Sequence, residues 1–199
     1  MQADVATAPL RGGDNGMYNF SSNPALTNVT FSGNSAGYGG GICNNSGNPT
    51  LTNVTFSGNV AAANGGGIEN DSYSYPTIRN TIFWGNTAAT GGAQIYNYLG
   101  SAPSLSYTIV QGGCPAGSTC THIITTDPLL GTLGNYGGYT QTIPLLAGSS
   151  AIDTGNDAVC PVTDQRGVTR PQGAHCDIGA FEVVSTPPPT HVYLPLVVR

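Results

Sequence analysis

Six charged residues in the C-terminal third of the chain are the richest candidates for chemistry. Only 8% of all residues are charged, yet one segment contains Asp153, Asp164, Arg166, Arg170, Asp177 and Glu182. Clustered carboxylates can hold a cation through oxygen ligands or accept hydrogen bonds from a carbohydrate. They can also form arginine–carboxylate pairs that fix loops without regular structure. Because the charges partly balance and lie between Gly and Pro turns, we favour the structural network over a ligand site.

The remaining sequence offers few groups for catalysis. Glu69 and Asp71 are the only acids between residues 15 and 113, and we expect their side chains to lie on opposite faces, without forming the pair that glycoside hydrolysis needs. Arg79 aligns with small hydroxyl residues in other copies of a repeat described below, so we expect a solvated surface residue. The histidines have no metal-type spacing, and no Ser or Cys lies in a nucleophile motif. We therefore expect neither a metal nor a cofactor.

The cysteines show no CxxC pair. Cys114 and Cys120 bracket one short loop, and Cys160 and Cys176 bracket another. Two local disulfides of this kind are typical of an exported protein. Cys43 is left over, and we expect it to be a small buried residue in a repeat position.

The elements that must position these residues form an internal repeat. The stretch LTNVTFSGN at Leu51 recurs at Leu26, and weaker copies begin at Ile78 and Leu105, a spacing of 25, 27 and 27 residues. A second landmark, a glycine cluster followed by an apolar residue, shares this period. Within each copy the apolar phase slips by one residue at an asparagine, which tolerates the left-handed bend that such a slip needs. These bend residues are Asn28, Asn53 and Asn80, and we expect their amides to bond along a stack.

This pattern predicts an all-β fold, a right-handed parallel β-helix of about four coils of 25–27 residues. A β-sandwich also has many short strands, but it does not predict near-identical copies at a fixed period. We expect a lead-in at 1–11, the repeats at 12–125, an irregular C-terminal cap at 126–184, and a Pro-rich linker with an apolar tail at 185–199. The inward columns are predicted to be Leu26, Leu51, Ile78 and Leu105; Phe31, Phe56, Phe83 and Val110; and Met17, Ile42, Ile68 and Ile95.

The outward positions change character along the repeats. Thr30 and Thr55 begin a hydroxyl column of the kind used in ice binding, but later copies place isoleucine there. An apolar strip with the only Trp of the chain is rarely left facing water. We therefore predict that residues C-terminal to the repeats cover Ile82, Trp84 and Ile109.

The repeats with FxGN and GGGI resemble those of polymorphic outer-membrane-protein-like right-handed parallel β-helices. The segment 127–182, with DQRG at Asp164 and DIGAFE at Asp177, is similar to the C-terminal part of large bacterial surface proteins of the choice-of-anchor type. The resemblance covers nearly the whole chain and implies a secreted or cell-surface bacterial protein without an assigned activity. Family members usually carry many more coils.

Charge and hydropathy exclude several classes of partner. A net charge of −5 gives no electrostatic footprint for nucleic acid, and no apolar run approaches the length of a membrane span. Residues 1–6 lack the pattern of a signal peptide, so we expect either that a signal has been removed or that the chain is the C-terminal piece of a longer protein.

We expect a non-enzymatic structural or adhesive module of an exported bacterial surface protein, which presents a polar β-helix face to glycans or proteins. One alternative is a polysaccharide-acting enzyme, a lyase or glycoside hydrolase, on analogy with other β-helices. Another is self-assembly, because the open edge of the first coil could stack on a second copy.

Overall fold

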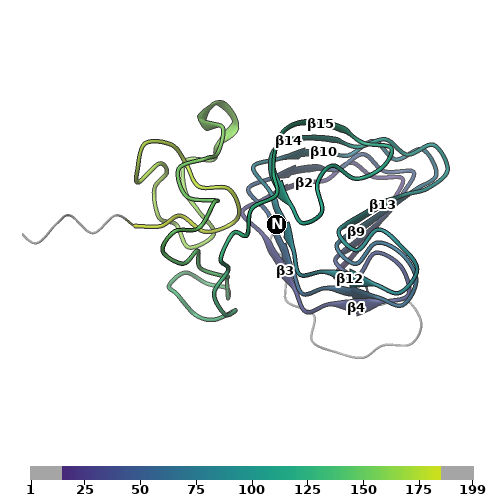
Figure 1. Cartoon of the computed structure of the whole chain (residues 1–199), viewed down its shortest axis with the longest axis horizontal. Helices are drawn as coiled ribbons and strands as arrows, with labels where there is room; N and C mark the ends of the chain where they lie inside the picture. Colours follow the sequence, from purple (N-terminus) through teal and green to yellow (C-terminus); the bar gives the residue numbers. More distant parts are fainter. Residues whose placement is uncertain (1–14, 185–199) are drawn as a thin grey trace, which may run out of the picture.

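The computed structural model describes residues 15–184, which form an all-β right-handed parallel β-helix of about four coils and an irregular segment beside it (Figure 1). The predictions for residues 1–11 and 185–199 lie outside the described residues. No helix within 15–184 is both long and apolar enough to cross a membrane.

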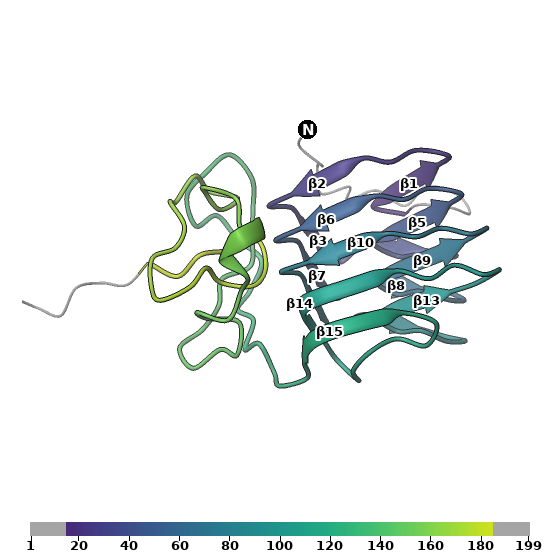
Figure 2. The same ribbon diagram turned by 90° about the horizontal axis from the view of Figure 1, so that it is seen from above.

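Each coil contributes strands to three parallel sheets, which stack as rungs in Figure 2. Sheet A comprises β1 (Met17–Phe20), β5 (Ile42–Asn45), β9 (Ile68–Asp71) and β13 (Ile95–Asn97). Sheet B bends in the middle. One half holds β2 (Ala25–Thr27), β6 (Thr50–Thr52) and β10 (Thr77–Arg79), and the other holds β3 (Thr30–Ser32), β7 (Thr55–Ser57) and β11 (Ile82–Trp84). Sheet C contains β4 (Ser35–Ala36), β8 (Val60–Ala61) and β12 (Thr87–Ala88).

The predicted inward columns form the core of the β-helix. Leu26, Leu51, Ile78 and Leu105 pair in register across sheet B, and the rings of Phe31, Phe56 and Phe83 stack with centroids 4.8 and 4.7 Å apart. Identical side chains can stack so closely because parallel strands in register place them one strand spacing apart. The repeat period therefore translates directly into a continuous core.

The bend in sheet B lies at the predicted asparagines. Asn28, Asn53 and Asn80 have φ angles of 55°, 52° and 46°, in the left-handed region. Tyr107 and His122, with φ of 49° and 51°, bend the following strands, and their rings stack 4.3 Å apart. The bend thus continues after the asparagine signal has ended.

The stack also continues after the last copy of the repeat, which begins at Leu105. β14 (Ser104–Val110) spans the bend, and β15 (Thr119–Ile124) pairs with it in parallel, Leu105 opposite Cys120. The connection from β14 to β15 is much shorter than a full coil, because the chain crosses the end of the β-helix directly and contributes no strand to sheets A and C. The predicted Cys114–Cys120 disulfide closes the crossing loop.

The expected amide stacking holds only in part for the bend asparagines. Asn80 Nδ2 donates to Asn53 Oδ1 at 3.2 Å, but Asn28 does not continue the stack. Continuous ladders form instead inside the β-helix, where water cannot serve as partner. One comprises Asn34, Asn59 and Asn86, and the other Asn19, Asn44, Asn70 and Asn97.

The cap, residues 126–184, covers one side of the β-helix, not its end (Figures 1 and 2). It contains one short 3-10 helix, Asp157–Val159, and otherwise irregular chain. Ile82 and Ile109 are fully buried in a second apolar cluster with Leu145, Ala151 and Ile178 of the cap, and partly buried Trp84 packs against this cluster. The apolar strip therefore lies beneath the cap.

The bend asparagines hold the cap through hydrogen bonds. Asn28 Nδ2 donates to Thr163 O at 2.6 Å, and Asn53 Nδ2 donates to Asp177 O and Gly179 O at 2.9 and 3.2 Å. Because Asn53 Nδ2 is used in this way, it is not available to continue the amide stack. Thr55 also faces the cap and accepts a hydrogen bond from Ala180 N at 3.0 Å.

Candidate functional site

The charged residues of the cap come together in a largely buried network. Arg170 Nη1 lies 2.8 Å from Glu182 Oε2, and Arg166 Nη2 lies 2.7 Å from Asp164 Oδ2. Asp177 accepts hydrogen bonds from Asp153 N and Val183 N at 2.9 and 2.7 Å. Burial raises the pKa of Asp177 to about 6, although these two hydrogen bonds act to lower it.

The oxygen atoms of this network are occupied by groups of the cap itself. Glu182 Oε1 accepts from Gln172 N and Oε2 accepts from Asp177 N, at 2.8 and 2.9 Å. Asp153 Oδ1 accepts from His175 N at 3.2 Å. Residues 15–184 contain no cluster of three or more acidic, His or Cys groups suited to a metal ion. This geometry fits a network that holds the cap loops in place, and the predicted Cys160–Cys176 disulfide closes the same segment.

A different site lies on the outer face of sheet A. Seven residues line a cavity of about 450 Å³, and we call it the sheet A groove: Tyr38, Cys43, Asn64, Glu69, Asp71, Tyr96 and Tyr98. In Figure 1, β9 and β13 are set back between the loops that enter and leave sheet A. The groove therefore has the outer face of a sheet as its floor.

Strand alternation places these side chains on one face. Ile42, Ile68 and Ile95 point into the core, so their successors Cys43, Glu69 and Tyr96 face outward in register. Asn44, Asn70 and Asn97 point inward again, and Asp71 faces outward two residues after Glu69. The expectation that Glu69 and Asp71 lie on opposite faces is wrong, because strand residues two positions apart share a face.

The turn before sheet A supplies one wall. Tyr38 lies directly before Gly39 and Asn64 directly before Gly65, and these glycines have φ of 57° and 70°. A Cβ on Gly65 would lie 2.5 Å from Ile68 O, so the turn needs glycine to fold this tightly. The repeated glycine cluster thus positions Tyr38 and Asn64 beside the outward residues of sheet A.

The floor of the groove is acidic and partly unpaired. Glu69 is 6% exposed, and its buried Oε2 has no hydrogen-bond partner. The buried Oδ1 of Asn64 also has none. Burial, with a smaller contribution from Asp71, raises the pKa of Glu69 to about 7. No basic side chain of the described residues lines the groove.

Cys43 differs from its prediction. It is free and half-buried on the outer face, not in the core, because it follows inward-facing Ile42. Burial and then the nearby Glu69 and Asp71 raise the pKa of its thiol to about 12. The thiol is therefore protonated and a poor nucleophile near neutral pH.

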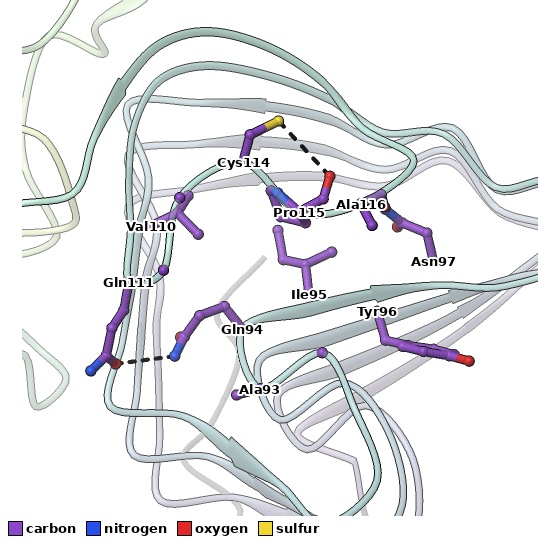
Figure 3. A pocket seen from close by; sticks show the side chains of 13 residues that line it. Ala93, Gln94, Ile95, Tyr96, Asn97, Val110, Gln111, Cys114, Pro115 and Ala116 are labelled. Atoms are coloured by element: carbon purple, nitrogen blue, oxygen red, sulfur yellow. Dashed lines mark hydrogen bonds between the residues drawn. The ribbon is translucent and has the colours of Figure 1, made fainter.

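A second cavity, of about 330 Å³, lies at the end of the β-helix between β13 and the crossing loop (Figure 3). Its polar side chains bond to one another or to the loop. Gln94 Nε2 donates to Gln111 Oε1 at 3.1 Å, and Asn97 Nδ2 donates to Ala116 O at 2.8 Å. This cavity thus offers fewer unpaired groups than the sheet A groove.

The tyrosines of the groove were not among the site residues predicted from the sequence. Tyr96 and Tyr98 stack with centroids 6.4 Å apart, and Tyr38 and Tyr98 are 54% and 50% exposed. One signal was present, since position 96 aligns with Cys43 and Glu69 in the repeat. Recognising it required assigning outward columns to sheet A as well as to sheet B.

Comparison with protein families matches two stretches of the chain. Residues 28–45 and 53–71 fit the model of the Chlamydia polymorphic membrane protein (Chlamydia_PMP) repeat. Each match begins at a bend asparagine and ends with a strand of sheet A, β5 or β9. Comparison with curated proteins and with solved structures gave no match. The fold and the matched repeats indicate a structural β-helix module of a surface protein.

Proposed function

We propose that this chain is a non-enzymatic adhesive module of an exported bacterial surface protein of the choice-of-anchor type. The sheet A groove is its binding face, toward glycans or proteins. The observation that carries this proposal is the lining of the groove, where exposed tyrosine rings stand beside two carboxylates.

The location of the groove follows from what the cap covers. Thr30 and Thr55 are 5% and 2% exposed, so the hydroxyl column that they begin is not available to a partner or to ice. The groove is open, and exposed tyrosine rings are common anchors in binding sites because they bury a large area at low entropic cost.

Binding to immobilised glycans and polypeptides would test the proposal. We expect the protein to bind a subset of the array, and Tyr98→Ala to weaken this binding about tenfold or more, as for an aromatic anchor. Tyr139→Ala is the matched control, because Tyr139 is fully exposed at 101% in the cap. Equal effects of both substitutions would contradict a role of the groove.

A glycoside hydrolase is the second candidate, favoured by two carboxylates on one face. A raised pKa would suit Glu69 to the role of general acid, with Asp71 as its partner. Release of reducing ends that Glu69→Gln and Asp71→Asn abolish would support this candidate over adhesion. For a lyase, which produces unsaturated uronates, turnover abolished by Arg79→Ala would be decisive, although Arg79 lies on β10 of sheet B.

Self-association through the first coil is a further proposal. Among the described strands, β1 to β4 each pair only with the following coil, and unpaired edges can template pairing with another chain. Sedimentation at increasing protein concentration should show dimers or larger species. A monomer throughout would exclude this mode of assembly.

A further inference from the structure

We propose that the sheet A groove binds the side-chain ammonium group of a lysine on a partner polypeptide. This inference rests on the proposed adhesive function and names the chemistry of the partner. Three features of the groove carry it: unpaired acceptors at the floor, carboxylates without a basic partner, and the depth of the floor below an aromatic rim.

The unpaired acceptors require hydrogen-bond donors. Glu69 Oε2 and Asn64 Oδ1 are buried without a partner, although buried polar atoms in native proteins are nearly always bonded. Both residues line the same cavity. A primary ammonium group has three donors and no acceptor, so it offers donors to unpaired oxygens of this kind without adding an unpaired acceptor.

The charge of the groove favours a cation over any anion. Glu69 and Asp71 both line the cavity, and all ion pairs among residues 15–184 lie in the cap. The chain contains no lysine, and its Arg79 is on sheet B. When Glu69 is ionised, above about pH 7, a compensating positive charge would therefore come from outside the described residues. An acidic polysaccharide would be repelled by the same pair of carboxylates.

The shape of the groove favours a cation on a long stem. Glu69 at the floor is 6% exposed, whereas Tyr38 and Tyr98 at the rim are about half exposed. A lysine side chain can pass its apolar methylenes along the tyrosine rings while its charged end reaches the carboxylate. The amine of an amino sugar is attached directly to the ring and has no such reach.

The pH dependence follows from the groups that face Glu69. Asp71 comes from the same strand, Cys43 from β5, Tyr38 from the preceding turn, and Tyr96 and Tyr98 from the chain at β13. The thiol of Cys43 stays neutral near pH 7, because its pKa is raised to about 12. Lysine stays protonated up to about pH 10, whereas Glu69, whose pKa is raised to about 7, changes its charge in this range. Affinity should therefore fall as the pH drops below about 7.

Titration with a short Gly/Ser peptide that carries one lysine would test this inference. The amide resonances of the groove residues report binding by NMR at pH 8. The same peptide with Nε-acetyl-lysine, which keeps the stem but loses the charge, should bind about tenfold more weakly or not at all. Two further probes test other cationic groups. One is the same peptide with arginine in place of lysine, and the other is a glucosamine oligosaccharide.

Two substitutions distinguish the effect of the groove's charge on binding from the effect of the net charge of the molecule. Glu69→Gln keeps the shape of the side chain and should reduce lysine-peptide affinity about tenfold. Asp157→Asn removes one negative charge from the cap, outside the groove, and should leave the affinity unchanged. Retention of binding by Glu69→Gln, or equal loss in both variants, would overturn the inference.

The outcomes also separate this inference from the proposed function. Equal binding of the acetylated peptide or the arginine peptide, or binding of the glucosamine oligosaccharide alone, would overturn the assignment to lysine. If array binding depends on Tyr98 but not on Glu69, the adhesive function stands and the lysine inference fails. If neither substitution affects array binding, both fail.

Discussion

Asn53 has two roles, one through its backbone and one through its side chain. Its backbone adopts the left-handed conformation that bends sheet B, with φ of 52°. Its side-chain amide donates to Asp177 O and Gly179 O in the cap. The residue is also fully buried, so a polar side chain there is stable only because it finds these partners.

Substitution of Asn53 should separate the two roles. Asn53→Gly keeps the bend but loses the hydrogen bonds, and we expect it to lower the free energy of unfolding by about 1–3 kcal/mol. Asn53→Ala should cost about 1–2 kcal/mol more, because alanine is strained in the left-handed region. Urea denaturation measures both. Equal stability of the two variants would show that the bend does not constrain this residue.

The carboxyl of Glu69 should make stability depend on pH. In the folded protein the carboxyl of Glu69 keeps its proton up to about pH 7, whereas the ordinary pKa of this group is 4.5. Stability from this group is therefore full below about pH 4.5 and is lost as the pH rises through 7. Glu69→Gln should remove that loss and stabilise the protein at pH 8 by up to about 3 kcal/mol. Thermal unfolding at pH 5 and pH 8 checks this, and an unchanged difference between the two pH values would contradict it.

At the scale of elements, Gly179 is a point of close contact between the cap and the β-helix. Its N–H donates to Asn80 O at 2.9 Å, and Arg170 Nη2 donates to its carbonyl at 2.8 Å. A Cβ at this position would lie 2.7 Å from Ile82 Cδ1 and 2.8 Å from Thr55 Oγ1. The absence of a side chain therefore permits the contact between cap and sheet B.

Gly179→Ala should destabilise the protein through this contact. Gly167→Ala is a matched control, because Gly167 has a similar φ, 90° against 98°, but a Cβ there would meet nothing within 4 Å. Both variants carry the cost of a left-handed alanine, about 1–2 kcal/mol. Crowding should cost Gly179→Ala about 1–3 kcal/mol more in urea denaturation. Equal costs would mean that the cap can move away from sheet B easily.

The elements of the repeats were predictable, but those that follow were not. Near-identical copies place Leu51 and Phe56 in register with their neighbours, since stacking equivalent residues is the only way such copies share one core. β15 carries neither the asparagine nor the glycine landmark. Its place beside β14 depends on pairing across the end of the β-helix, which no local pattern records.

At the scale of the whole molecule, two apolar clusters lie on opposite sides of one sheet. The first fills the β-helix, and the second joins the outer face of β11 and β14 to the cap. Trp84 packs at the edge of the second cluster, so its fluorescence reports on cap docking separately from the core.

Loss of the cap disulfide should loosen the cap before the β-helix unfolds. Replacing Cys160 and Cys176 by serine removes a cross-link over 16 residues, which is worth about 3 kcal/mol in the unfolded state. We expect Trp84 emission to shift to the red at a lower urea concentration than the loss of β-sheet circular dichroism. The same replacement of Cys114 and Cys120 should leave the two transitions together. Coincident transitions in the first variant would show that cap and coils unfold as one unit.

The amino-acid sequence by itself determined the coil and the residues that fill it. Period, inward columns and bend positions depend on local alternation and on stacking of like residues, and both are visible in the repeats. The tertiary structure decided which outer face is covered and which is open. The cap contacts Asn53, Thr55 and Ile82 across long separations in sequence, while Glu69 and three tyrosines meet only when successive coils stack. Such contacts arise from geometry between distant segments, so no local pattern could specify them.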